Sequence, residues 1–348
     1  MEIITLLKTV IEKGASDLII VAGTSPIIRI AGELFPADTT SISDNEAKSL
    51  IYSLLTPAQI ESFERTKEYD CSHELKGLGR FRVNIHYQKG TVAASLRLIP
   101  SDIPTIEDLR LPKIVADFAN LERGLVLVTG PTGSGKTTTQ ACMVNMINSN
   151  RSRHVITIED PIEYVHGNKR SIVEQREVGI DTESFSAALK HVLRQNPDVI
   201  LIGEMRDLET IQTAITAAET GHLVISTLHT NDAVQAIDRI IDVFPPHQQA
   251  QVRTQVSLSL QGIIAQQLIP KMDKRGLIVA TEVLVATSAV RNLIRKGTTQ
   301  EIYSMLDIGA KYGMQSMDTS LKNLYNNKTI SYEQALAHAI NQEHFEKL

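Results

Sequence analysis

The sequence predicts an α/β protein in which a small N-terminal α+β domain precedes a larger core built on a mostly parallel sheet. The length of 348 residues suits about two domains. After residue 113, apolar strand-like runs alternate with helix-compatible segments, which is typical of a parallel sheet covered by helices. Before it, residues 100–112 contain three prolines, which interrupt helices and strand pairing and therefore indicate a linker.

The composition favours a soluble, cytoplasmic protein. Hydrophobic residues make up 42% of the chain, and no apolar run reaches the roughly 18–20 residues that a membrane span requires. The N-terminus carries acidic residues and no cleavage-site pattern, so no signal peptide is expected. Cys71 and Cys142 lack metal-ligand spacing and indicate a reducing environment. A formal net charge of −5 and a pI of about 6.1 argue against a nucleic-acid partner.

Residues 1–99 show the periodicities of a small α+β domain. Apolar side chains recur at helical spacing over residues 3–13. A second helical section is expected from about Ser43 to Arg65, with Ser43 or Asp44 as its cap. The expected strands are Leu18–Val21, Ile27–Ile30, Arg80–Tyr87 and Val92–Ile99.

Residues 113–287 are expected to form the core, and residues 288–348 a C-terminal segment of short helices. The apolar runs predict core strands at Leu125–Thr129, His154–Glu159, Val199–Gly203, Leu223–Leu228 and Ile278–Leu284. Core helices are expected at residues 135–148, 184–194, 207–220, 232–241 and 247–264. The C-terminal segment favours helices at residues 288–296, 299–309, 316–326 and 331–340.

The first core strand leads into a glycine-rich turn with the spacing G-x-x-x-x-G-K-S/T, the P-loop signature. Its glycines permit backbone angles at which successive N–H groups face a phosphate, and the following helix adds its positive dipole end. Lys136 is expected to reach the β- and γ-phosphates of a nucleotide, and the Thr137 hydroxyl to bind Mg²⁺. The alternative, a chance match, is disfavoured by the correct flanking segments. The predicted nucleotide-binding residues are Gly130, Pro131, Thr132, Gly133, Ser134, Gly135, Lys136, Thr137 and Thr138.

An acidic stretch, ITIEDPIEY, follows the second core strand. It presents Glu159, Asp160 and Glu163 at a strand's carboxyl end, where ligands bind in open α/β sheets. One of these carboxylates could orient or deprotonate an attacking water, and Glu159 is also a candidate Mg²⁺ ligand. A solvated or helix-capping turn is the alternative, which the neighbouring P-loop disfavours.

A third motif, PDVILIGEMRD, ends a buried-type strand in Gly203 and Glu204. This is a Walker B pattern, in which an acid serves the Mg²⁺ side of the site, and Glu204 stands where Asp is commoner. Asp207 is expected instead to cap the helix that follows, because aspartate side chains accept hydrogen bonds from helix N-terminal amides.

Two histidines bracket the strand in ETGHLVISTLHT. His222 and His229 are seven residues apart, so on a strand they point to opposite faces and a shared metal is disfavoured. His229 lies at the strand's carboxyl end with Thr227 and Thr230, where an imidazole can sense a γ-phosphate. A core histidine is the alternative for each.

Four notable arginines are assigned to the first domain: Arg80, Arg82, Arg97 and Arg110. Surface arginines are usually only solvated. A guanidinium supplied by a neighbouring subunit, however, can neutralise charge on a transferring phosphoryl group, which accelerates hydrolysis by about 10³–10⁵-fold.

The four motifs, in this order, resemble those of the secretion-superfamily ATPases that drive type II secretion and type IV pili. The similarity covers essentially the whole chain and looks closest to the retraction ATPases of type IV pili. GASDLII and GRFRVNIHYQKGTVAASLRLIP look like the small PAS-like domain of that family. SAVRNLIRKG resembles its A-I-R-N-L-I-R-E element, from which Val290 and Lys296 depart.

This resemblance implies a RecA-like core, a PAS-like N-terminal domain and a helical C-terminal subdomain in a homohexamer. ATP and Mg²⁺ would be bound between the domains of the same or the next subunit, and hydrolysis would power pilus retraction and twitching motility. The implied partners are an inner-membrane platform protein and, through it, pilin. On the family pattern Glu163 would activate water and Glu204 would act on Mg²⁺ or water. Arg82 and Arg97 would be arginine fingers, and His222 and His229 would link phosphate state to domain rotation.

Four alternatives remain open at this point. A retraction-assisting paralogue would share every motif. An assembly ATPase would usually carry an extra N-terminal domain and a tetracysteine zinc site, which a chain with only two cysteines disfavours. A nucleic-acid translocase is disfavoured by the acidic balance. A switch without turnover is disfavoured by the combination of Lys136, Glu163 and Glu204.

Overall fold

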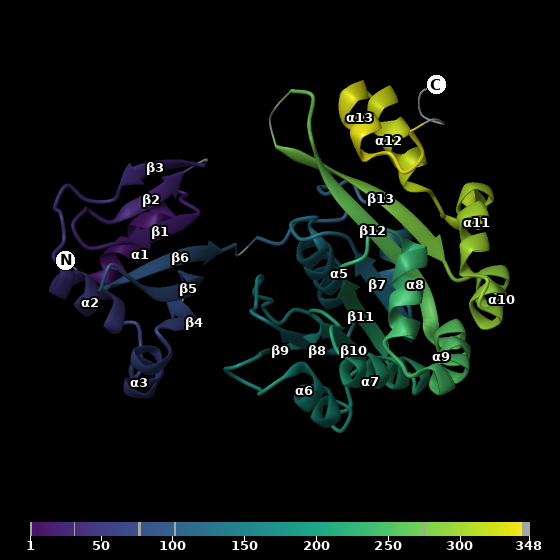
Figure 1. Ribbon diagram of the computed structural model, residues 1–348, viewed down its shortest axis with the longest axis horizontal. Coiled ribbons are helices and arrows are strands. Elements are labelled where there is room, and N and C mark those ends of the chain that lie inside the picture. The colour runs from purple at the N-terminus through teal and green to yellow at the C-terminus, as the bar shows by residue number, and fades with distance from the viewer. Residues whose placement is uncertain (1, 31, 76–77, 101, 274–275, 343–348) are drawn as a thin grey trace. The chain divides into compact units, whose positions relative to one another are not determined.

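The structure is a computed structural model that describes residues 2–30, 32–75, 78–100, 102–273 and 276–342. The chain forms two compact units, Met1–Asp102 with Glu163–Val165, and Ile103–Ile162 with His166–Leu348. Figure 1 labels their elements. Ser101 and residues 343–348, which belong to the predicted linker and C-terminal segment, lie outside the described residues. Within the described ranges, every helix is too short or too polar to span a bilayer.

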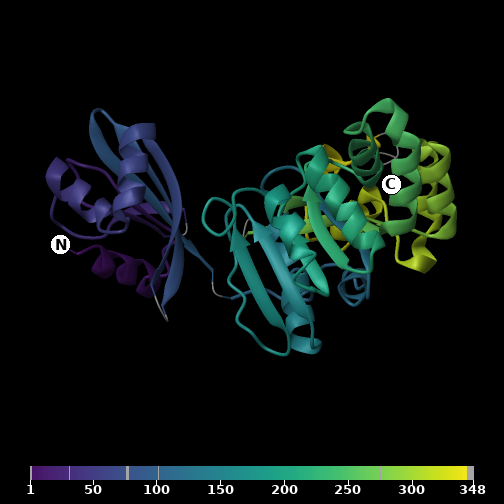
Figure 2. The same cartoon turned by 90° about the horizontal axis from the view of Figure 1, so that it is seen from below.

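The N-terminal unit is a six-stranded antiparallel sheet with three helices on one face (Figure 2). Along the sheet the strand order is β3-β2-β1-β6-β5-β4. The strands are β1 (Asp17–Ile20), β2 (Ile27–Ile30), β3 (Glu33–Pro36), β4 (Glu68–Leu75), β5 (Gly79–Gln88) and β6 (Thr91–Ile99). The helices are α1 (Ile3–Glu12), α2 (Asp44–Tyr52) and α3 (Pro57–Thr66).

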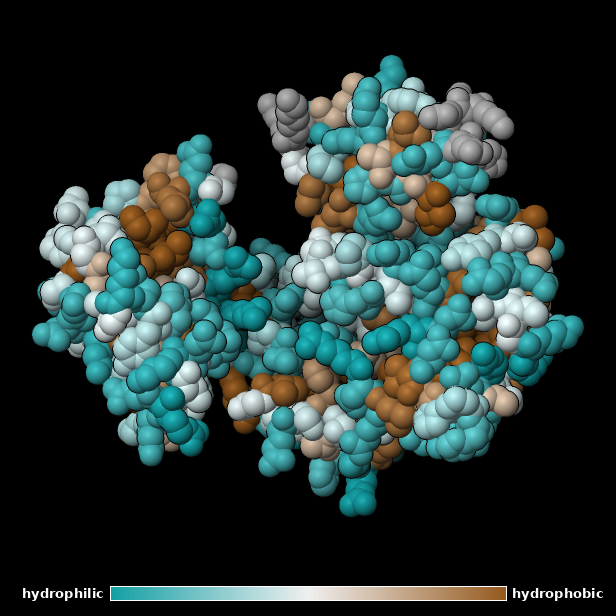
Figure 3. Space-filling view, viewed as in Figure 1, coloured by the Kyte–Doolittle hydropathy of each residue, from teal (hydrophilic) through white to brown (hydrophobic). Residues whose placement is uncertain are grey.

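The alternation of apolar and polar side chains along the strands decides which face of the sheet the helices cover. Phe81, Val83 and Ile85 of β5 are fully buried in one cluster with Leu7 of α1 and Ile51 of α2. The intervening residues of β5 are polar and point to the other face, which no helix of this unit covers (Figure 2). At the β3 end the surface is apolar, with Leu34 54% exposed (Figure 3).

The predicted elements of this unit are largely present, with three differences. The section from Ser43 to Arg65 is two helices, because Thr56 and Pro57 begin α3 after a short break. Ser43 is the cap of α2, as predicted, and accepts a hydrogen bond from the Glu46 amide. Strands β3 and β4 were not predicted, since the residues of β3 are all exposed and β4 is mostly polar.

The second unit is organised by a seven-stranded sheet in the order β13-β12-β7-β11-β10-β8-β9. All neighbours are parallel except the hairpin of β12 and β13, which confirms the predicted mostly parallel α/β core. The strands are β7 (Gly124–Thr129), β8 (His154–Glu159), β9 (Ile172–Glu177), β10 (Val199–Ile202), β11 (Leu223–Leu228), β12 (Leu260–Pro270) and β13 (Leu277–Val285).

Helices cover both faces of this sheet, as buried parallel strands require. One face packs on α4 (Ile114–Ala119) and α5 (Lys136–Asn150). The other packs on α6 (Phe185–Val192), α7 (Leu208–Glu219), α8 (Ala233–Asp242), α9 (Pro246–Ser259), α10 (Ser288–Lys296) and α11 (Ile302–Ile308). The far end of the hairpin packs on α12 (Met317–Asn326) and α13 (Tyr332–His338). The 3₁₀ turns Thr299–Glu301 and Ala310–Tyr312 flank α11.

In this unit one predicted helix and part of the predicted linker need correction, and α4, β9 and β12 were not predicted. The helix predicted at 247–264 ends at Ser259, and residues 260–264 begin β12 instead. Gly262 leaves room in this strand for the Phe118 ring, because a Cβ at this position would lie 2.1 Å from that ring. The edge strand β9 was missed because its sequence, IVEQRE, is polar and half-exposed. Part of the predicted linker is packed into the core, where Ile106 and Leu111 are buried.

The departures at Val290 and Lys296 both fit α10. Val290 is fully buried, and Lys296 lies in the last helical turn, where a cation interacts favourably with the helix dipole. Arg291 donates from Nη1 to the carbonyl oxygens of Ser257 and Leu258 at the end of α9. Residues 288–342 belong to the second unit, so a separate C-terminal subdomain stays a prediction.

A buried carboxyl ties three elements of this unit together. Glu282 of β13 is only 1% exposed, and its Oε1 accepts a hydrogen bond of 2.9 Å from the Ala233 amide of α8. The backbone amide of Met317, in α12, also lies close to this carboxyl and lowers its pKa. Burial, together with the nearby Asp232 carboxylate, raises the pKa of Glu282 to about 7.

Glu282→Gln is expected to make the unfolding free energy less dependent on pH. As the pH rises from 4.5 to 7, the unfolded chain releases a proton that folded Glu282 retains, so the wild-type protein loses stability over that window. The shift corresponds to about 3 kcal/mol at most. The variant keeps a side-chain oxygen and does not titrate. Its unfolding free energy should therefore increase relative to that of the wild type between pH 5 and pH 8. Urea unfolding at both pH values measures this gain, and parallel pH dependences would contradict the prediction.

Candidate active site

The P-loop joins the fully buried strand β7 to α5 through residues 130–135. Gly130 has φ 143°, and a Cβ there would lie 2.4 Å from the Gln266 carbonyl oxygen and 2.6 Å from Ser134 Oγ. Gly135, with φ 87°, caps α5 in the left-handed region. The motif therefore needs glycine at Gly130 because space is lacking and the backbone angle is unfavourable for other residues.

Interactions inside the protein shape this loop. Lys136 is 9% exposed, and its Nζ donates to the carbonyl oxygens of Gly130 and Pro131, each at 2.9 Å. From β12, Gln266 Nε2 donates to the Ser134 carbonyl oxygen at 2.9 Å. The lysine ammonium thus lies at the loop, beside the amino terminus of α5, where an anionic phosphate is favoured.

Gly130→Ala is expected to weaken nucleotide binding by more than about tenfold, because the new methyl group must displace the backbone at Gln266. Gly133→Ala is the matched control: Gly133 also has a positive φ, of 79°, but nothing lies within 4 Å of its Cβ position. The control should therefore carry backbone strain of about 1–2 kcal/mol without the clash, and its loss of affinity should be smaller than that of Gly130→Ala. Titration with a fluorescent ADP analogue compares the two, and equal affinities would refute the steric argument.

The structure brings Glu204 and His229 together from different motifs. They follow the neighbouring parallel strands β10 and β11, and His229 Nε2 lies 3.3 Å from Glu204 Oε2. Glu204 is also paired with Arg206, whose Nε lies 2.7 Å from the same oxygen. Thr227 Oγ1 donates to the Gly203 carbonyl oxygen at 2.6 Å, which holds the two strand ends in register. The Glu204 side chain is only 14% exposed, whereas its partners are more open to solvent, at 46% for His229 and 72% for Arg206.

The acidic stretch divides into a buried and an exposed part. Glu159 is buried, and its Oε1 accepts hydrogen bonds from Thr157 Oγ1 at 2.6 Å and Gln175 Nε2 at 3.0 Å. These two contacts fix the orientation of the Glu159 carboxylate, and its role at a metal stays a prediction. Glu163 is exposed and belongs to the short segment that groups with the first unit.

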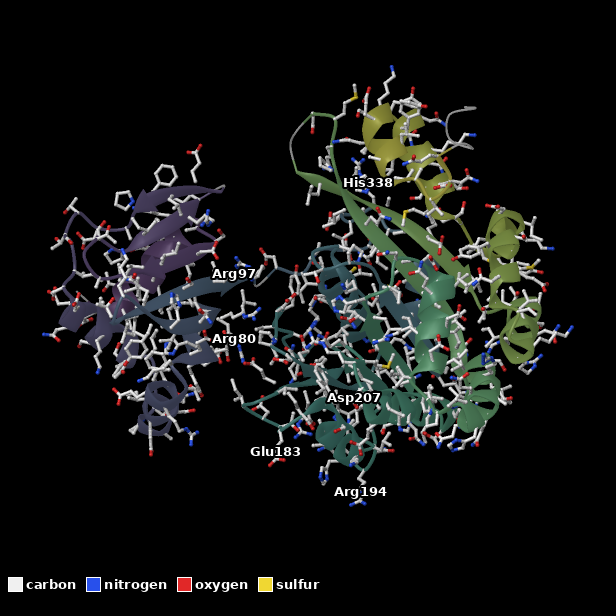
Figure 4. All side chains as sticks on the ribbon, viewed as in Figure 1. Arg80, Arg97, Glu183, Arg194, Asp207 and His338 are labelled. Atoms are coloured by element: carbon white, nitrogen blue, oxygen red, sulfur yellow. The ribbon has the colours of Figure 1, made fainter. Side chains whose placement is uncertain are left out.

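His222 lies at the opposite end of β11 from His229. A strand of six residues spans about 20 Å, which separates the two imidazoles. His222 Nδ1 lies 2.9 Å from the Ala217 carbonyl oxygen, near the end of α7. Asp207, at the start of the same helix, accepts from the Thr210 amide at 2.9 Å and is its cap, as predicted (Figure 4).

Arg82 and Arg97 lie directly opposite each other on β5 and β6. Both are on the sheet face away from the helices of the first unit, on which Figure 4 labels Arg80 and Arg97. Like charges in such a pair are unfavourable, and Asp17 of β1 relieves this by accepting from Arg97 Nε at 2.9 Å. Arg80 Nη2 donates to Ser72 Oγ. The assignment of Arg110 to the first domain was wrong, because this residue belongs to the second unit.

Two residues at this site were not predicted. Gln266 supports the P-loop from β12, and Arg206 pairs with Glu204. Arg206 stands two residues after the Walker B acid, a spacing that could have drawn attention to it. The role of Gln266 depends on the pairing of β12 with β7, for which the sequence offers no local signal.

Known proteins similar to this chain include secretion-system proteins and ATPases of type IV pili. The family model described as "Type II/IV secretion system protein" matches residues 108–304. The chain belongs to this family. It is 46% identical, over 99% of its length and all of the relative's, to the type IV pilus retraction ATPase PilT of Pseudomonas aeruginosa. It is 44% identical to the type IV pilus ATPase PilU of the same organism, over 97% of this chain and 89% of PilU.

A solved structure of the pilus retraction motor PilT with bound ADP superimposes with a TM-score of 0.94 at 45% identity and covers all of both chains. This confirms the predicted fold and the resemblance to retraction ATPases. The chain is a P-loop ATPase of this family and binds nucleotide.

Proposed function

We propose that this chain is the ATP-hydrolysing motor of type IV pilus retraction and works as a homohexamer. The observation that carries the proposal is the preformed P-loop in one sheet with the Glu204–His229 pair. The full-length similarity to PilT supports pilus retraction as the process that this ATPase site powers. The partners we propose are an inner-membrane platform protein and, through it, pilin, so the protein would work in the cytoplasm at that membrane.

The binding steps follow from the P-loop. Its backbone amides and the amino terminus of α5 would hold the nucleotide phosphates, and Lys136 would contribute its charge to the β- and γ-phosphates. Gly130, Gly133 and Gly135 allow the loop backbone to approach the phosphates closely.

Magnesium fits the residues present. The Thr137 hydroxyl and the Glu204 carboxylate are the hard oxygen ligands that Mg²⁺ prefers. No group of three or more His, Cys, Asp or Glu side chains in the described ranges could form a metal cage, so the ion would depend on the nucleotide's oxygens as well. When bound, it would neutralise charge on the phosphates.

Hydrolysis would then depend on three groups of side chains. Glu163 would activate the attacking water, and the Glu204–His229 contact would report the loss of the γ-phosphate to the start of α8. Arg82 and Arg97 would come from a neighbouring subunit. The uncovered sheet face, and the 71% exposure of the Arg97 side chain, support this assignment.

Deletion of the gene in its host tests this function. Loss of twitching with excess surface pili, reversed by the wild-type gene and not by Lys136→Ala, is the expected result. Cells without pili would instead indicate an assembly ATPase. DNA-stimulated ATP hydrolysis at moderate salt would favour a translocase.

A retraction-assisting paralogue is the second candidate, because PilU matches this chain nearly as well as PilT does. Expression of this chain alone in a strain that lacks all other retraction ATPases separates the two. Restored twitching supports the motor, whereas twitching only when a second retraction ATPase is present supports the paralogue.

A further inference from the structure

The loop that carries Glu163 is held at both ends by side chains of the edge strand β9. The Ile162 amide donates to Glu177 Oε2 at 3.3 Å, and the His166 amide donates to Gln175 Oε1 at 2.8 Å. Only three residues, 163–165, lie between these two contacts. Gln175 and Glu177 are two positions apart on the strand, so both point to the same side of the sheet.

Gln175 connects this loop to the buried end of β8. While its Oε1 accepts from the His166 amide, its Nε2 donates to Glu159 Oε1 at 3.0 Å. Glu159 is fixed in turn by Thr157 Oγ1, at 2.6 Å from the same oxygen. Thr157 pairs with Gln175 in the parallel register of β8 and β9, and Glu159 pairs with Glu177. The side-chain amide of Gln175 therefore connects His166, after the Glu163 loop, to Glu159, at the end of the strand before it.

This arrangement matters because an exposed side chain has few contacts of its own to fix it. Glu163 is exposed, so the position of its carboxylate depends on the backbone that carries it. A general base must stand within hydrogen-bond reach of the water that it activates, and a misplacement of about 1 Å can cost about 10²-fold in rate. Anchors on both sides of a three-residue span would limit such a displacement.

We propose that Gln175 is a positioning residue for ATP hydrolysis, which holds the Glu163 loop in its working place, and that Glu177 is its second anchor. The proposal rests on the proposed function, in which Glu163 activates water. Neither side chain needs to touch the nucleotide for this role.

Gln175→Met tests the proposal because methionine keeps the length of the side chain and loses both hydrogen bonds. The expected result is a kcat lowered by about 10–100-fold, with KM for ATP, nucleotide affinity and ring assembly within about twofold of wild type. Glu174→Gln is the matched control: Glu174 is the adjacent residue, points to the other side and lies 3.0 Å from His154 Nε2. It should keep the wild-type kcat. A wild-type kcat in Gln175→Met, or a loss confined to KM, would overturn the proposal.

A double-mutant cycle with Glu163→Gln shows whether Gln175 acts through Glu163. If it does, Gln175→Met should lower the kcat of Glu163→Gln by less than about threefold, because the group that it positions is already disabled. A full multiplicative loss would overturn the proposal. The cycle also separates the two claims. Wild-type turnover in Glu163→Gln alone would refute the proposed base and the positioning role together, whereas an inactive Glu163→Gln beside an unaffected Gln175→Met would refute only the positioning role.

Glu177 supplies an independent test should Gln175→Met fail to fold. Glu177→Gln keeps a side-chain oxygen for the Ile162 amide and should retain kcat within about threefold of wild type. Glu177→Met removes that acceptor and should lower kcat by tenfold or more, with nucleotide affinity unchanged. Equal kcat values in the two variants would count against the anchor. Hydrogen exchange of the Ile162 and His166 amides provides a readout without turnover, and each amide should exchange faster only when its own anchor is lost.

Discussion

Glu163→Gln is expected to lower kcat for ATP hydrolysis by about 10²–10⁴-fold, the usual contribution of a general base. The amide keeps the size and hydrogen-bonding reach of the carboxylate and loses its ability to accept the proton. Nucleotide affinity should be unchanged, because the phosphates would be held by the P-loop, where Lys136 Nζ already lies at the loop carbonyl oxygens.

Two further variants distinguish a loss of nucleotide binding from a loss of turnover. Lys136→Ala should lose nucleotide binding itself, so it separates binding from turnover. Glu204→Gln should resemble Glu163→Gln in binding ATP while barely hydrolysing it. A phosphate-release assay and an equilibrium titration with an ATP analogue measure the two quantities. Wild-type turnover in Glu163→Gln would assign the base to another residue.

Arg97→Ala is expected to abolish the hydrolysis that depends on the assembled ring. A guanidinium that neutralises the transferring phosphoryl group is worth about 10³–10⁵-fold in rate, or about 4–7 kcal/mol. To serve in this way Arg97 must leave Asp17, which accepts from its Nε at 2.9 Å. The Arg97 side chain is 71% exposed, and the more buried Asp17 would keep Arg29 Nε at 3.5 Å, so the loss of this contact is small beside the expected gain.

Mixed rings test whether the arginine acts on a neighbouring subunit. Arg97→Ala subunits have an intact P-loop, and Lys136→Ala subunits have an intact arginine, so mixing two inactive variants should restore part of the activity. Arg29→Ala is the control, because Arg29 also approaches Asp17, at 3.5 Å in the same cross-strand row, and should leave turnover nearly unchanged. No recovery at any mixing ratio would count against action between subunits.

The sequence by itself was sufficient for features encoded in contiguous residues. The P-loop is one such feature, because the glycines, Lys136 and the flanking strand and helix lie within one short run. Helix caps are another: Ser43 and Asp207 are where the local pattern placed them, since a cap needs only an acceptor and an amide three residues on. Apolar strands buried on both faces also revealed the parallel sheet.

Only the tertiary structure decided which side chains meet. Glu204 and His229 are 25 residues apart, and they touch because β10 and β11 pair in one particular register. The same pairing leaves His222 at the far end of its strand. Strand β9 has no clear apolar period because it lies at the sheet edge, yet its Gln175 contacts both Glu159 and the Glu163 loop. A pattern of residue types specifies which elements form, whereas contacts between distant side chains depend on strand order and register, which the whole chain determines.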